Sequence, residues 1–238
     1  MKIRPFLASA LAAALLAGAC GAPDTRSFAI ENAIFESVYL DRTLPAQADL
    51  TPEAQARVAA GLSAICKGET GGARQLIRDS RIGERIYRLA LVAAKADRKG
   101  KCDYAAWPGQ EVLLGDRFKQ LVNSGDPAAV LLAALLDKSL GEPDRRRIVE
   151  ALSGRRYSQA EAIQADLLAG GSPADQQKAQ ELLADAAQQG ATPAYRLLAR
   201  LHREGRGVPA DAAKACQYLR DAAARGSEAA AAELQACK

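Results

Sequence analysis

Residues 170–190 read GGSPADQQKAQELLADAAQQG and residues 206–226 read RGVPADAAKACQYLRDAAARG. Aligned at an offset of 36 positions, the two stretches are identical at eleven of 21 positions, and each ends on a glycine, Gly190 and Gly226. Self-similarity with a fixed period of about 20–50 residues indicates a solenoid built from one repeated supersecondary unit. This repeat therefore sets the expected fold.

The repeated unit predicts a pair of helices. In the unit at about 194–229, which contains the second stretch, apolar side chains recur at helical spacing, at Ala194, Leu197, Leu198 and Leu201. A turn at Pro209 leads to a second helix over residues 210–224, and Gly226 suits the left-handed position that follows a helix. Neither helix is long enough to be stable alone, so neighbouring units must stack. Alanine is abundant and favours helices, so we expect an all-α protein.

One unit resembles a known family. Its turn and second helix contain Gly205-Arg206-Gly207-Val208-Pro209-Ala210-Asp211, then Lys214-Ala215, Ala222-Ala223 and Gly226. This G-x-G-V-x-x-D, K-A, A-A-x-x-G pattern is similar to the Sel-1-like repeat, a relative of the tetratricopeptide repeat with a 36-residue period. The copy at 170–190 departs from the pattern at Ser172, where valine is expected.

The resemblance implies a right-handed α-α superhelix, a solenoid of tetratricopeptide-like helix pairs, over residues 111–238. The expected elements are units at about 126–157, 158–193 and 194–229, with a capping helix at 230–238. In the first unit, Gly154 lies 36 positions before Gly190 and is expected to close a helix over residues 145–153.

Residues 28–110 are not covered by the resemblance, and we predict a helical region there, either diverged repeats or a cap. Its first segment, residues 28–40, places apolar residues four apart at Ile30, Ile34 and Val38. That spacing favours a helix, while the β-propensity of these residues leaves a strand possible.

Later segments carry clearer helix signals. Thr51 is a predicted N-cap with Pro52 in the first helical position. Further helices are expected over residues 84–97, 112–124 and 128–140.

Residues 1–19, MKIRPFLASALAAALLAGA, have the pattern of a bacterial export signal, with basic residues before a short apolar run. That run is too short to span a bilayer comfortably. Cys20 follows at the cleavage point, which predicts a lipid anchor on Cys20 and a tether over residues 20–27. Cleavage after Ala19 without lipidation, which would give a soluble periplasmic protein, stays open.

The net charge and the cysteine content limit the possible classes of partner and the cellular compartment. Beyond the export signal the chain has 30 basic and 28 acidic residues, a net charge of +2, which argues against nucleic acid as a partner. Four cysteines remain besides Cys20, and in an exported protein they favour two disulfides. We predict Cys66–Cys102 and Cys216–Cys237, because each pair falls within one helical neighbourhood, while the other connectivities stay open.

No pattern in the chain indicates an enzyme. The serine-hydrolase, metalloprotease and phosphate-loop motifs are absent from the sequence, and no cofactor or metal site is expected. The single histidine, His202, has no partner at motif spacing, so we predict a structural or merely exposed side chain. Asp175 and Asp211 each fall in the first turn of a helix, where capping explains a carboxylate.

The best candidate binding surface is a row of arginines. Arg196, Arg200 and Arg203 recur at i, i+4 and i+7 on the face opposite the leucines, next to Tyr195. The resemblance implies that the first helix of each pair lines a concave groove. There the row would bind an acidic peptide, an acidic protein or an anionic polysaccharide. A solvated helix face without a binding role is the plainer interpretation.

Together these features predict a monomeric, non-catalytic adaptor in the bacterial cell envelope. It would face the periplasm from the outer membrane and bind an envelope protein or peptide through its repeat groove. One alternative is an accessory lipoprotein of an exopolysaccharide or other secretion machine. Another is a cell-wall-binding or enzymatic envelope protein whose site lies in residues 28–110, with a pocket near Trp107 as its mark.

Overall fold

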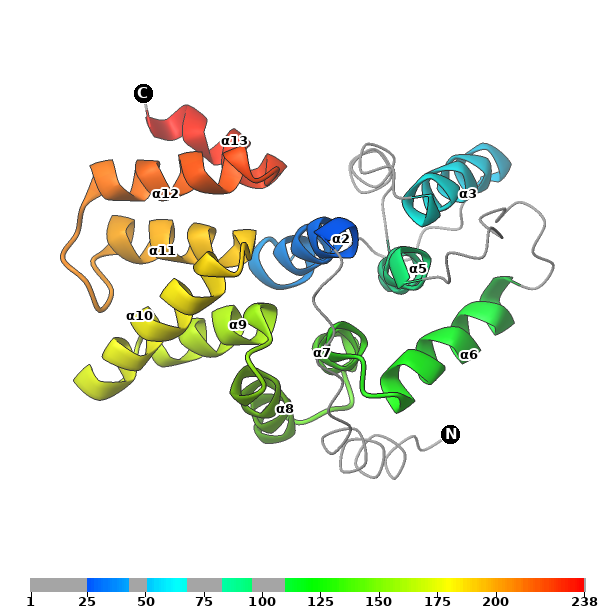
Figure 1. The fold of residues 1–238 in the computed structure, drawn as a ribbon, viewed down its shortest axis with the longest axis horizontal. Helices are drawn as coiled ribbons and strands as arrows, with labels where there is room; N and C mark the ends of the chain where they lie inside the picture. The colour runs from blue at the N-terminus through cyan, green and yellow to red at the C-terminus, as the bar shows by residue number, and fades with distance from the viewer. Residues whose placement is uncertain (1–24, 43–50, 68–82, 96–109, 238) are drawn as a thin grey trace. The chain divides into compact units, whose positions relative to one another are not determined.

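The computed structural model describes residues 25–42, 51–67, 83–95 and 110–237 (Figure 1). In these ranges the chain forms eleven α-helices, a π-helix and a 3-10 helix, and no strand. The all-α prediction is therefore confirmed. The predicted export signal, Cys20 with its tether, Cys102 and Trp107 lie outside the described residues.

The chain divides into two compact units. Unit 1 takes the chain as far as Val38 and then Arg42–Leu136, and unit 2 takes Tyr39–Asp41 and the chain from Asp137 onward. The short segment Tyr39–Asp41 thus belongs to the unit formed by residues about 100 or more positions later in the sequence.

Unit 1 is built around one central helix. Its α-helices in the described ranges are α2 (Thr25–Phe35), α3 (Pro52–Cys66), α5 (Glu84–Lys95), α6 (Gln110–Asn123) and α7 (Pro127–Leu136). Helix α5 packs against all of the others, α2, α3, α6 and α7. Tyr87, Ala90, Leu91 and Ala93 of α5 are almost completely buried, as a helix with neighbours on several sides requires.

The segment after the tether is helical, as its four-residue spacing predicts. Ile30, Ile34 and Val38 are all buried, so their period of four sets the inner face of this segment. The strand alternative is wrong here. Helix α2 gives way to a π-helix, η1 (Glu36–Leu40), which is a rare local form often found at functional sites.

Helix α3 begins as the sequence predicts. The Thr51 side chain accepts a hydrogen bond from the Ala54 N–H at 3.3 Å, and Pro52 occupies the first helical position. A backbone hydrogen bond and the Thr51 side chain both lower the pKa of Glu53 in the same first turn. Val58, Leu62 and Ile65 form the buried stripe of this helix.

Unit 2 is a succession of helices, each packed on the next. They are α8 (Glu142–Gly154), α9 (Ser158–Leu168), α10 (Pro173–Gln188), α11 (Thr192–Glu204), α12 (Ala212–Ala224) and α13 (Glu228–Glu233), ending in a 3-10 helix, η2 (Leu234–Cys237). Helix α9 also packs against α11, its counterpart one repeat later. Helices α11 and α12 lie side by side, as Figure 1 shows. The two best repeat copies therefore each form a helix pair.

The two copies start their second helix at different points. In the first copy Ser172 is the N-cap of α10, and Ser172 and Asp175 form a reciprocal capping box. In the second copy the equivalent position is Val208, which has no capping oxygen, so Asp211 becomes the N-cap of α12 and accepts from the Lys214 N–H at 2.9 Å. One substitution thus moves the helix start by three residues relative to the repeat.

The helix ends show a second departure from the predicted period. Gly190 and Gly226 follow their helices with φ of 87° and 91°, as glycine in the left-handed position should. Gly154 does not play this part, because α8 includes it and Arg156 takes the left-handed conformation at φ 59°. The expectation that Gly154 continues the series is wrong for this reason.

The predicted first unit also differs in its helices. Helix α7 ends at Leu136, not at Leu140, because Asp137 accepts hydrogen bonds from the backbone and side chain of Ser139 and starts a turn. Helices α7 and α8 belong to different compact units.

Candidate binding surface on helix α11

The predicted arginine row lies on α11, but its members differ widely in exposure. Arg196 is 9% exposed, the Arg200 side chain is 30% exposed, and Arg203 is exposed. Leu197, Leu198 and Leu201 are buried, as predicted. Almost all of α11 is covered, so the row is not a uniformly solvated face.

Arg196 is held by two carboxylates from opposite ends of the described chain. Its Nη2 and Nη1 donate to Asp41 Oδ1 and Oδ2 at 2.7 and 3.3 Å, and its Nε donates to Glu233 at 2.9 Å. Asp41 precedes Arg196 by 155 positions, and Glu233 lies in α13. The two carboxylates accept hydrogen bonds from the N–H donors of the planar guanidinium. Their negative charges offset the free-energy cost of burying its positive charge.

Arg200 takes part in a second contact of the same kind. It forms an ion pair with Oδ1 of Asp166, on α9, and Asp166 Oδ2 accepts a hydrogen bond from the Tyr39 hydroxyl at 3.0 Å. Tyr39 and Asp41 thus approach α11 together, and each meets the polar groups around one arginine. The segment Tyr39–Asp41 is therefore a ligand of this surface within the same chain.

The remaining residues of the predicted surface divide into covered and open. Tyr195 is buried, with the guanidinium of Arg225 4.5 Å from its ring centroid, a cation–π contact. Arg203 is the exposed member at the end of α11. Of the predicted binding residues, Arg203 is therefore the one classed as exposed, and Arg200 is partly exposed.

The side chain of His202 is packed against other side chains of unit 2. It is buried and stacks on Tyr218 with ring centroids 5.5 Å apart, and its backbone carbonyl accepts from the Asp211 N–H at 2.8 Å. Asp175 and Asp211 cap helices, as predicted. Within the described ranges no group of three or more His, Cys, Asp or Glu residues is arranged to hold a metal ion.

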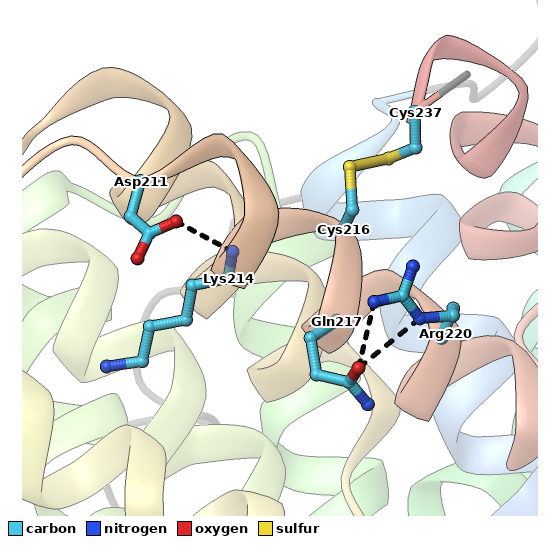
Figure 2. The surroundings of a disulfide bond; sticks show 6 residues. All are labelled: Asp211, Lys214, Cys216, Gln217, Arg220 and Cys237. Atoms are coloured by element: carbon cyan, nitrogen blue, oxygen red, sulfur yellow. Dashed lines mark hydrogen bonds between the residues drawn. A yellow bond between two sulfur atoms is a disulfide. The ribbon is translucent and has the colours of Figure 1, made fainter.

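A disulfide joins Cys216 of α12 to Cys237 of η2 (Figure 2). It is one of the two bonds that the sequence predicts, and it ties the C-terminal helices to the last repeat. Because α13 carries Glu233, the same bond holds one of the two acids of Arg196 in place. Cys66 is also disulfide-bonded, but its predicted partner Cys102 lies outside the described residues.

Sequence reasoning missed the acids around α11 and one further buried acid. Asp41, Asp166 and Glu233 stand far from Arg196 and Arg200 in sequence, so no motif spacing could connect them. Glu161 on α9 is 2% exposed and accepts from Gln189 at 2.8 Å; burial, opposed by Arg156, raises its pKa. A glutamate inside an alanine-rich helix was the available signal.

The chain was compared with protein-family models, curated proteins and solved structures. No protein-family model, no curated protein and no solved structure matches it. Of the helices in the described ranges, none is long and apolar enough to cross a membrane.

Proposed function

We propose that this chain is an exported, non-catalytic adaptor that binds an acidic segment of another cell-envelope protein through helix α11. One observation carries the proposal: the arginines of α11 already bind carboxylates that come from separate segments. Arg196 takes Asp41 and Glu233, and Arg200 takes Asp166. A surface that binds carboxylates of its own chain has the donors that an acidic partner needs.

The architecture supports a binding role. We propose that unit 2 is a short solenoid of Sel-1-like repeats, with α9/α10 and α11/α12 as two successive units. The contacts of α9 with both α10 and α11 are those that stacked helix pairs make. Such arrays bind partners along the surface formed by their first helices, which here are α9 and α11.

The site of action is part of the proposal. The pattern of residues 1–19 and the position of Cys20 support export and lipid anchoring. A change of Cys20→Ser should release the protein from the membrane fraction into the soluble periplasmic fraction. Unchanged membrane association of this variant would reject the lipid anchor and leave the adaptor function standing.

Site-specific photocrosslinking tests the binding role. A photoreactive amino acid in place of Arg203, in the full exported chain, should give one discrete adduct with an envelope protein, because Arg203 is the accessible end of the α11 row. The matched control replaces Arg220, an exposed arginine on α12. No adduct at position 203, or the same adduct at position 220, would contradict binding through α11.

A further inference from the structure

We infer that the surface of α9 and α11 recognises a segment with tyrosine and a carboxylate two residues apart, and that Tyr39–Asp41 is its resident, displaceable occupant. The inference rests on the proposed binding function and specifies the partner: an acidic peptide segment that carries Tyr-x-Asp. The recognition chemistry is the one seen within the chain. The tyrosine hydroxyl donates to Asp166, and the carboxylate accepts two bonds from Arg196.

The site keeps its own partners when the segment leaves. Arg196 retains Glu233 on its Nε and Nη2, and Arg200 retains Asp166. An ion pair usually resists opening because one buried charge would lose its counter-charge. Here Arg196 and Arg200 each keep a carboxylate when Tyr39 and Asp41 leave, so this cost does not arise. The fixed acids hold the surface in shape for a replacement.

The resident segment is a strained ligand. It includes the end of the π-helix η1, and Arg42, the residue directly after Asp41, has a left-handed backbone with φ 48° although it is not glycine. Both local conformations are unfavourable and persist only where contacts hold them. A free peptide that ends at Arg42 is not tied to a following chain, so its last residue need not keep the left-handed conformation.

The resident segment also leaves part of the surface unused. The Nε of Arg200 is buried without a hydrogen-bond partner in the described part of the chain. The Asp41 side chain is 28% exposed, so a competitor can reach the carboxylate it must replace. A competing peptide can reach the bound carboxylate, and the segment leaves one donor of the site without a hydrogen bond among the described residues. We therefore expect another ligand to be able to replace this segment.

Peptide binding to the full-length chain tests the exchange. The probe is a fluorescent peptide of residues 36–42, ESVYLDR, and the control peptide carries the Tyr→Phe and Asp→Asn changes. The protein variant combines Tyr39→Phe with Asp41→Asn, which weakens the resident segment without changing its size. In an anisotropy titration, this variant should bind the probe at least about tenfold more tightly than it binds the control peptide, because only the probe has the tyrosine hydroxyl and the charged carboxylate.

Two comparisons complete the test. The unmodified chain should bind the probe at least about tenfold more weakly than the variant, because its own segment competes at an effective concentration in the millimolar range. A matched variant with Tyr218→Phe and Asp221→Asn on α12 keeps the resident segment and should behave like the unmodified chain.

Three outcomes would overturn the inference. Equal affinity for the two peptides would show that the tyrosine and carboxylate are not read. Equal affinity of variant and unmodified chain would show that nothing is displaced. Loss of the helical circular dichroism of the variant would show that the segment is structural. If the exchange fails but the adduct at position 203 still forms, the adaptor function stands without this site. If the exchange succeeds but no adduct forms at position 203, the adaptor function and the partner inferred from it are both rejected, and only the exchange of the chain's own segment stands.

Discussion

The two units of this protein organise their helices in different ways. In unit 1, α5 is a hub that packs against each of its neighbours, whereas in unit 2 each helix packs on the next along the chain. A hub concentrates many contacts in one helix, so its stability is vulnerable at one place. A succession of helices distributes stability over nearest-neighbour interfaces, so a change at one interface has a limited reach.

Each unit has a cation bound to two carboxylates, a lysine in unit 1 and an arginine in unit 2. In unit 1, Lys95 at the end of α5 lies 2.9 Å from both Glu31 of α2 and Asp126 at the start of α7. In unit 2, Arg196 donates to Asp41 through Nη1 and Nη2 and to Glu233 through Nε and Nη2. Lysine carries a compact charge on a flexible stem, whereas arginine presents a rigid planar group with several donors, so it can bind two carboxylates at fixed geometry.

The largest expected effect is at the hub. Lys95→Met should destabilise unit 1 by roughly 3–5 kcal/mol, because it removes the positive charge that both the buried Glu31 and Asp126 contact. Denaturant unfolding measures the loss. Lys119→Met is the matched control, since its ammonium is exposed and lies 3.8 Å from Asp116, and it should change stability by less than about 0.5 kcal/mol. Equal effects of the two variants would contradict the hub.

The same lysine adds a pH dependence of known sign. Burial by itself would lower the pKa of Lys95, but the charges of Glu31 and Asp126 outweigh it and raise the pKa. A raised folded-state pKa means that the stabilising contribution is complete below the ordinary pKa of lysine and is lost as pH rises through the folded value. Lys95→Met should therefore lower stability less at strongly alkaline pH than at neutral pH.

The second effect tests whether unit 2 behaves as a succession of helices. Replacing Cys216 and Cys237 with serine opens a loop with a sequence separation of 21 and should cost roughly 3 kcal/mol on the chain-entropy model. Hydrogen exchange should rise mainly in α12, α13 and η2, and little in α8 and α9. Uniform loss of protection through unit 2 would mean that its helices unfold as one block.

A third, smaller effect compares the two cations directly. Arg196→Lys keeps the charge but loses the fork that binds Asp41 and Glu233 at once, and it should cost about 1–3 kcal/mol. Thermal unfolding measures it. Arg220→Lys on the exposed face of α12 is the control and should be nearly silent. If both substitutions are silent, the geometry of the arginine does not matter to unit 2.

The smallest effect concerns a helix end. Arg156→Gly should relieve a left-handed arginine and stabilise unit 2 by up to about 1 kcal/mol, less the exposed ion pair with Asp185 at 3.3 Å. Gly190→Ala, at the corresponding helix end, should instead destabilise by about 1–2 kcal/mol. Chemical denaturation of both variants checks the opposite signs. A loss of stability in Arg156→Gly larger than an exposed ion pair can explain would contradict the strain at this position.

Several local features of this protein follow from its sequence. The helix favoured over residues 28–40, the N-cap at Thr51, and the left-handed Gly190 and Gly226 depend on neighbours within about four positions, which periodicity and residue type record. Where the residue type differs between repeat units, the 36-residue period alone predicts the start or the end of a helix wrongly. Ser172 provides a capping oxygen that Val208 lacks. At the end of α8, Arg156 has the left-handed conformation that the period predicts for Gly154.

The sequence also determined which arginines lie together on α11, because i, i+4 and i+7 share a helix face. Only the tertiary structure decided what they meet. Asp41 comes from 155 positions before Arg196, and Asp166 on α9 receives both Arg200 and Tyr39. Contacts at such separations depend on how whole helices pack, and packing is a property of buried surfaces that a local pattern does not record. The row read from the sequence as an open basic strip is, in the folded protein, a surface with a ligand of its own.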